Sequence, residues 1–175
     1  MKPNLHFTIH THSAALPEGW DAIAEKNTFL SRRYLAVLEQ SAPDNMDCHF
    51  IGLYKDDVLC GIALSQYINL SRINTFVAGK KGFCLKDYIF NKFSSHILII
   101  GNNTLTGQNA YLLTDAITEA DALQLLKDVL QQLKKQYRKK CVYMNLLSVK
   151  DFNSAQLPNF KKCRLQRLLY LLHPA

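Results

Sequence analysis

Hydrophobic and polar positions recur along the chain in two different periods, and the period indicates which type of element each segment forms. The clearest helical pattern covers 118–139, where one apolar stripe follows helical spacing. The stripe consists of Ala122, Leu125, Leu126, Val129 and Leu133. Thr118 and Asp121 resemble a helix-start capping pair, and lysines gather at the opposite end, where they complement the helix dipole. We therefore predict one long amphipathic helix.

The clearest strand signal is a hairpin. The β-rich runs 48–54 and 58–69 lie on either side of the short turn Lys55-Asp56-Asp57. Both runs are apolar at successive as well as alternate positions, which predicts a sheet covered on both faces. Further strands are predicted at 6–11, 96–101, 110–113 (after an interruption at 102–108), 141–149 and 164–173. Helices are predicted at 17–26, 31–40, 87–95 and within 151–162.

This order of elements predicts an α/β (α+β) domain with a mixed, mostly antiparallel central sheet flanked by helices. The 175 residues, 48% of them apolar, suit a single domain over 1–175. No apolar run is long enough to span a bilayer, and the first residues do not resemble a signal peptide. The sequence therefore predicts a cytoplasmic protein.

Cysteine and histidine spacing gives no metal site. The five cysteines include no C-x-x-C pair, which argues against a zinc ribbon and against a disulfide framework. His10 and His12 share one face of a predicted strand, but further ligands are not near them in the sequence. We expect no metal.

The formal charge of +7 is concentrated late in the chain, in the clusters 134–140 and 161–167. Such clusters can bind RNA, with Tyr137 and Tyr170 as stacking partners. No RNA-recognition motif accompanies them, and solvated cationic faces are the plainer interpretation.

The order of strand, two helices, hairpin, strand, long helix, strand, short helix and strand resembles the GNAT superfamily of acyl-CoA N-acyltransferases. Two segments sharpen the resemblance. Phe29-Leu30-Ser31 with Tyr34-Leu35 and Leu38-Glu39 is similar to the opening of FemAB-like, peptidoglycan-related acyltransferases. Asn153-Ser154-Ala155 leading to Phe160 is similar to a late stretch of the superfamily. The last strand of that fold has no counterpart before Ala175.

The resemblance implies transfer of an acyl group from acyl-CoA or aminoacyl-tRNA to a primary amine. It places the acyl-facing backbone at Leu112, Leu113 and Thr114, and cofactor contacts at Asn145 and Asn153. GNAT enzymes hold pyrophosphate with a Gln/Arg-x-x-Gly-x-Gly/Ala loop before the long helix, where backbone N–H groups approach the anion. The corresponding segment here, 113–119, contains no glycine and carries two acidic residues.

Four more residues are weaker candidates. Tyr67 or Tyr143 could protonate a leaving thiolate, although strand tyrosines are more often packing residues. Lys80 and Lys81, set between glycines, could bind an anion or substrate, although a solvated loop tip is the plainer interpretation. The plainer interpretation of Asn145 is a strand residue whose amide forms a hydrogen bond in the sheet. For Asn153 it is the N-cap of a helix.

Three function classes remain open at this point. The first is an active N-acyltransferase. The second is a non-catalytic, degenerate acyltransferase-like domain that binds substrate, forms a homodimer through its unfinished sheet edge, or is the first half of a longer two-domain protein. The third, an RNA-binding module, rests on charge alone.

Overall fold

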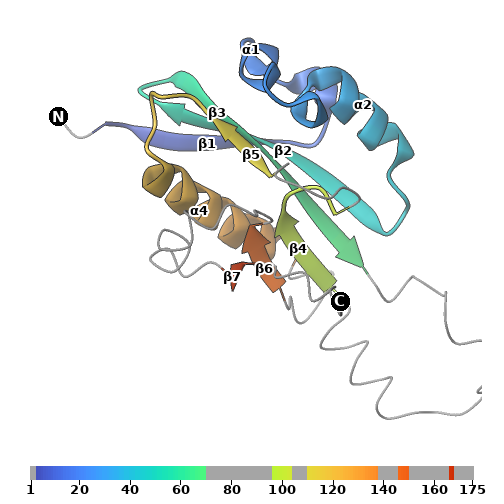
Figure 1. Ribbon diagram of the computed structural model, residues 1–175. Helices are drawn as coiled ribbons and strands as arrows, with labels where there is room; N and C mark the ends of the chain where they lie inside the picture. Colours follow the sequence, from blue (N-terminus) through green and yellow to red (C-terminus); the bar gives the residue numbers. More distant parts are fainter. Residues whose placement is uncertain (1–2, 70–95, 104–109, 138–145, 150–165, 168–175) are drawn as a thin grey trace, which may run out of the picture.

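A mixed, mostly antiparallel β-sheet lies between helices on its two faces (Figure 1). The helices α1 (Trp20–Ala24) and α2 (Arg32–Ser41) cover one face, and the long helix α4 (Glu119–Tyr137) covers the other. This is the mixed α/β class that the order of elements predicts. The computed structural model describes residues 3–69, 96–103, 110–137, 146–149 and 166–167.

The sheet has the order β1-β2-β3-β4-β6-β7, and β5 pairs with β3 outside this path. The strands are β1 Leu5–His10, β2 Met46–Lys55, β3 Val58–Asn69, β4 His96–Ile100, β5 Tyr111–Leu113, β6 Leu146–Val149 and β7 Gln166–Arg167. Neighbouring strands are antiparallel except for the pairs β4–β6 and β6–β7, which are parallel. Two 3-10 turns, η1 (Ser13–Ala15) and η2 (Thr28–Leu30), flank α1.

The predicted hairpin is confirmed as β2 and β3, which pair from Met46↔Ile68 to Lys55↔Val58. Its turn residues Asp56 and Asp57 both have positive φ, 49° and 64°. Two such residues form the tight turn whose twist matches that of the strands, and aspartate tolerates this conformation better than most residues. The turn is also fastened to the start of β1, because Asp56 N–H donates to the Asn4 carbonyl over 2.9 Å.

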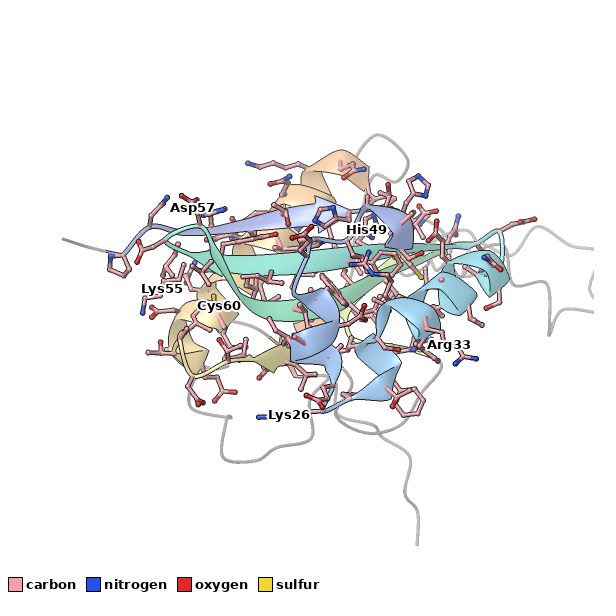
Figure 2. All side chains as sticks on the ribbon, turned by 90° about the horizontal axis from the view of Figure 1, so that it is seen from above. Lys26, Arg33, His49, Lys55, Asp57 and Cys60 are labelled. Atoms are coloured by element: carbon pink, nitrogen blue, oxygen red, sulfur yellow. The ribbon has the colours of Figure 1, made fainter. Side chains whose placement is uncertain are left out.

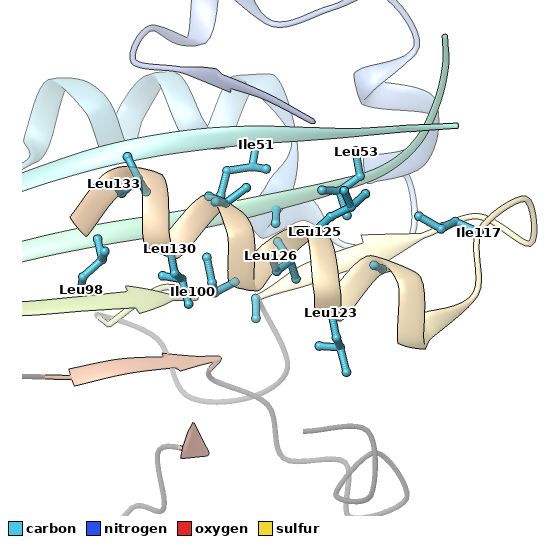
Figure 3. Packing of buried hydrophobic residues seen from close by; sticks show 14 of the residues in the cluster. Ile51, Leu53, Leu98, Ile100, Ile117, Leu123, Leu125, Leu126, Leu130 and Leu133 are labelled. Atoms are coloured by element: carbon cyan, nitrogen blue, oxygen red, sulfur yellow. The ribbon is translucent and has the colours of Figure 1, made fainter. Parts of the chain in front are cut away.

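The larger core lies between the sheet and α4 (Figure 3). Leu126 from the apolar stripe of α4 and its neighbour Leu130 pack against Ile51 and Leu53 from β2 and Ile100 from β4, and all five are at most 1% exposed. The stripe predicted from helical spacing is therefore the buried face of this helix.

The second core fills the opposite face of the sheet and centres on Trp20. Its indole is fully buried, and Nε1 donates to the Leu30 carbonyl over 2.8 Å. Phe50, Ile62 and Leu64 come from the central strands to the same cluster. Because both faces are packed, the central strands read as continuous apolar runs in the sequence.

The sequence predicts the presence of α1 and α2 correctly, but it misplaces the first residue of α1. α1 begins at Trp20 rather than at Pro17, because Gly19 adopts the left-handed conformation with φ 81° and separates Pro17 from the helix. Ser31 is confirmed as the N-cap of α2, since its hydroxyl accepts from Tyr34 N–H. The predictions for 71–95, 141–145 and 151–162 lie outside the described residues.

Candidate functional site

β4 and β5 occupy one strand position along β3, interrupted in the middle. Ser65 pairs with Ile100 in β4, and Ala63 pairs with Tyr111 in β5. Leu64, between these two β3 residues, bonds to both halves: its carbonyl accepts from Gly101 N–H over 2.7 Å, and its N–H donates to the Ala110 carbonyl over 3.1 Å. Gly101, which follows β4, and Ala110, which precedes β5, therefore meet at the same point on β3. This confirms the interruption that the sequence predicts within this strand.

The hydrogen bonds between β5 and β3 determine which backbone groups of β5 point to the edge that faces away from β3. Leu64 N–H donates to Ala110, and Thr114 N–H donates to the Cys60 carbonyl over 2.9 Å. Because bonding alternates along an antiparallel pair, Leu112 between them also faces β3, and Leu113 faces away from it. Among the described strands, β5 pairs with β3 alone. Of the three predicted acyl-facing residues, Leu113 is thus the one that presents its N–H to the outer edge.

The side chain of Leu113 is seated on the sheet by a glycine. A Cβ atom at Gly61, the β3 residue opposite Leu113, would lie 2.8 Å from Leu113 Cδ2 and 3.2 Å from Leu53 Cδ1. A real Cβ atom would not approach Leu113 Cδ2 so closely, so glycine at this position leaves room for the Leu113 side chain over β3.

The turn from β5 into α4 is held by its own groups. Thr114 Oγ1 accepts from Ala116 N–H over 3.4 Å, and Lys55 Nζ donates to the Ala116 carbonyl over 2.8 Å. At the helix start, Thr118 Oγ1 accepts from Asp121 N–H over 3.2 Å and donates to Asp121 Oδ2 over 2.7 Å. The predicted capping pair is confirmed, and it occupies one backbone donor, Asp121 N–H, that could otherwise bind an anion at this helix end.

Negative charge surrounds the same turn. Asp115 is exposed, Glu119 and Asp121 lie in the first turn of α4, and Glu119 accepts a hydrogen bond from the Tyr111 hydroxyl over 2.8 Å. Carboxylates stabilise a helix N-terminus electrostatically and disfavour phosphate beside it.

A second polar cluster lies where α4 ends against the sheet. The Tyr137 hydroxyl donates to Asp47 Oδ2 over 2.8 Å and lies 2.9 Å from His49 Nε2. The Tyr67 ring stacks on the Tyr137 ring with centroids 3.9 Å apart, and the Tyr67 hydroxyl lies 2.8 Å from His96 Nδ1. These five side chains come from β2, β3, β4 and α4, so the cluster joins the helix end to three strands.

Burial shifts the pKa of two members of this cluster, Tyr137 and His96. Burial and then the Asp47 carboxylate raise the pKa of Tyr137 well above its usual value, so its hydroxyl stays protonated and donates to Asp47. Burial lowers the pKa of His96. Tyr137 is 3% exposed, so the interpretation of Tyr137 as a base-stacking residue for RNA is wrong. Tyr67, 5% exposed, packs in the core between the strands and α4.

A cavity of about 310 Å³ opens beside this cluster. It lies at the end of the sheet away from the hairpin turn, as the positions of His49 and Asp57 show (Figure 2). It is lined by Thr11, Glu39, Ala42, Met46, Asp47, Cys48, His49, Gln136 and Tyr137. The lining thus combines the ends of α2 and α4 with the first residues of β2.

Glu39 closes one side of the cavity and ties α2 to η1. Its Oε2 accepts from Ser13 N–H over 2.8 Å and from Ser13 Oγ over 2.7 Å, while Oε1 lies 2.8 Å from His12 Nδ1. The Ser13 backbone bond and then the His12 bond lower the pKa of Glu39 below its ordinary value of 4.5.

The Glu39→Gln variant should therefore have a flatter acid limb of stability than the wild type. A carboxyl with a lowered folded-state pKa stabilises the fold at pH values above its unfolded-state pKa, and this contribution is lost as pH falls through the folded-state value. At pH 7 the variant should be less stable by roughly 1 kcal/mol, because the carboxylate is partly solvent-screened. Urea unfolding at pH 7, 5, 4 and 3 measures the difference, and a constant gap down to pH 3 would contradict this role.

Five of the predicted site residues lie outside the described part of the chain. They are Lys80, Lys81, Tyr143, Asn145 and Asn153. The remaining candidates do not form one site. Leu112, Leu113 and Thr114 lie at β5, whereas Tyr67 belongs to the polar cluster at the other end of α4.

His10 and His12, the two histidines considered for a metal, have separate partners. His10 Nε2 lies 2.9 Å from Thr8 Oγ1 within β1, whereas His12 lies beyond the strand and contacts Glu39. Within the described ranges, no group of three or more His, Cys, Asp or Glu side chains is arranged to hold a metal ion.

No sequence motif marks Asp47, His49 or Glu39 as site residues. Asp47 and His49 alternate in an otherwise apolar strand, so their side chains share the face on which α4 packs. Tyr137 continues the apolar stripe four residues after Leu133, which signals burial. These signals suggest polar groups on a buried face, but not their partners 88 and 90 residues away.

No protein-family model matches the sequence, and no curated protein matches it. The chain is similar to a solved structure described as a crystal structure of a bacterial toxin, with TM-score 0.49 and 13% sequence identity. The match covers 91% of this chain and 79% of the toxin chain, and at this similarity it carries no argument about function. None of the helices in the part of the chain that the structure describes combines the length and apolar character of a membrane span.

Proposed function

We propose that the chain is a GNAT-type N-acyltransferase domain that transfers an acyl group from acyl-CoA or aminoacyl-tRNA to a primary amine. The observation that supports this most directly is the interrupted strand β4/β5. It follows the hairpin, precedes the long helix and has a parallel neighbour, β6, beside its first half. In the GNAT order of elements this is the fourth strand, which supplies the backbone that faces the acyl group.

The chemistry follows from the outer edge of β5. An amine that attacks the acyl carbonyl carbon generates a tetrahedral intermediate with negative charge on the former carbonyl oxygen. The Leu113 N–H, which points away from β3, is the donor that would stabilise this oxyanion. The rest of the rate enhancement would come from holding the acyl donor and the attacking amine in the orientation that the reaction requires. Tyr67 is not assigned as the general acid, because its hydroxyl is engaged with His96 in the core.

A second candidate function is a non-catalytic domain of the same architecture. It is favoured by the turn before α4, where glycines are absent and Asp115, Glu119 and Asp121 carry negative charge. A CoA pyrophosphate at this turn would meet carboxylates and a helix start that is already capped.

Titration with acetyl-CoA separates the two candidates. A ligand that binds the native state raises the melting temperature, so a saturable increase at micromolar acetyl-CoA would support the acyltransferase. Absence of any increase at millimolar acetyl-CoA would favour the non-catalytic domain or an aminoacyl-tRNA donor, which a parallel titration with aminoacyl-tRNA distinguishes.

The Asp115→Asn variant tests whether the pyrophosphate of acetyl-CoA binds at the turn before α4. Asp115 is exposed, so removing its charge should leave the fold intact. If pyrophosphate lies at this turn, the variant should bind acetyl-CoA about fivefold more tightly, since a unit charge about 4 Å away costs about 1 kcal/mol in water. Glu25→Gln, an exposed change at the end of α1, is the matched control. Equal affinity in both variants would contradict pyrophosphate binding there.

A further inference from the structure

The cavity at the end of the sheet lies where β1 stops and β2 continues. The last paired residues are His10 in β1 and Phe50 in β2, and the chain turns away from Thr11 into η1. The first residues of β2, 46–49, therefore extend past the end of β1, and all four line the cavity. One side of this cavity is thus a short stretch of open strand edge.

Cys48 presents its main chain to this edge. Asp56 N–H bonds to Asn4 in β1, and Asn69 N–H bonds to the Asn45 carbonyl in the β2–β3 pair. Because bonding alternates along each pair, even-numbered residues of β2 face β1 and odd-numbered residues face β3. Cys48 is the even-numbered residue next beyond Phe50, where the pairing with β1 ends, so no β1 residue pairs with its N–H and carbonyl. It offers one donor and one acceptor in strand geometry.

The charges around this edge are negative. Asp47 and Glu39 bring carboxylates from β2 and α2, and the described lining contains no lysine or arginine, although the chain as a whole carries +7. The outer side of Glu39 faces His12, which is largely exposed. Burial, with the nearby Asp47 and Glu39 carboxylates, raises the pKa of the Cys48 thiol to about 11, so the thiol adds no charge at neutral pH.

We propose that this cavity binds the amino terminus of a peptide. The ammonium group lies between Asp47 and Glu39, and the first peptide group pairs with the Cys48 main chain as a short added strand. Strand addition to an open edge is a common mode of peptide recognition, and charge-assisted bonds to carboxylates select the ammonium. A cavity of about 310 Å³ accommodates the end of a peptide rather than a long segment. This inference is independent of the acyltransferase proposal, because it uses neither β5 nor the turn before α4.

The test is an NMR titration of the full chain labelled with 15N-cysteine, which gives signals from the five cysteine amides alone. The Cys48→Ser variant identifies the Cys48 signal by its loss. The probe is glycyl-alanyl-alaninamide, and the same peptide with an acetylated amino terminus is the matched control. We expect a saturable shift of the Cys48 signal with the free peptide, and none with the acetylated one.

The Asp47→Asn variant tests the charge with little change in packing, because the amide oxygen still accepts from the Tyr137 hydroxyl. It should weaken binding of the free peptide at least about tenfold, the loss typical of one charge-assisted hydrogen bond. Glu25→Gln should bind as the wild type does. An unchanged Cys48 signal, equal binding of the acetylated peptide, or full affinity in Asp47→Asn would each overturn the proposal.

Discussion

Replacing Trp20 with alanine should lower the free energy of unfolding by about 3–5 kcal/mol, the usual cost of deleting a buried aromatic side chain. The indole is fully buried in the cluster between α1, α2 and the sheet, so alanine leaves a cavity that this short helix cannot fill. The Leu30 carbonyl also loses its indole donor. Since whole domains are stable by only about 5–15 kcal/mol, part of the population could unfold at room temperature.

Urea unfolding followed by far-UV circular dichroism measures this effect, because Trp20 is the single tryptophan and the variant loses its fluorescence signal. Trp20→Phe keeps most of the ring but not the N–H, and should lose roughly 1–2 kcal/mol less than the alanine variant. Val37→Ala, at a side chain 58% exposed on α2, should change stability by less than about 0.5 kcal/mol. A loss below about 1 kcal/mol in Trp20→Ala would contradict the buried position.

If the chain transfers acyl groups as proposed, the Leu113→Pro variant should reduce kcat for that reaction by about 100- to 1,000-fold, the usual loss when one oxyanion donor is removed. Proline lacks the N–H, and in strands it is tolerated where the N–H points away from the ladder. Leu113 meets that condition, because β3 bonds to Leu112 and Thr114 instead. Thiol release from acetyl-CoA with a panel of primary amines gives the rates.

Leu113→Ala is the matched control for this prediction. It removes the same side-chain packing over Gly61 but keeps the N–H, so it should retain kcat within about tenfold. Thermal melts of both variants check that the sheet is intact. Equal kcat values in the proline and alanine variants would show that the Leu113 N–H does not contact the reacting oxygen.

The elements that could be predicted from the sequence are those whose buried residues form a regular pattern along the chain. The α4 stripe and the β2–β3 hairpin are clear because one face of a helix, and both faces of central strands, must be apolar to pack. The start of α1 was misplaced, since the positive φ of Gly19 is a local conformation that Pro17 and Glu18 do not reveal.

The site was less predictable than the fold. The resemblance to the GNAT order of elements suggested Leu112, Leu113 and Thr114, but the register with β3 was needed to show that Leu113 faces outward. Asp47, His49 and Tyr137 meet only after α4 folds back over the sheet, so no local spacing connects them. Side-chain partners that are distant in sequence depend on topology, which periodicity does not encode.

The two bonds of Leu64 hold Gly101 and Ala110, the residues on either side of segment 102–109, at one point of β3. Since Gly101 and Ala110 meet the same β3 residue, the distance between the ends of this segment does not depend on its length. Doubling a loop costs only about 0.6 kcal/mol in closure entropy, so long and short versions fit on one sheet without a change of register. The register of β4 and β5 on β3 therefore does not fix the length of chain between Gly101 and Ala110, so a foreign sequence can be grafted between them.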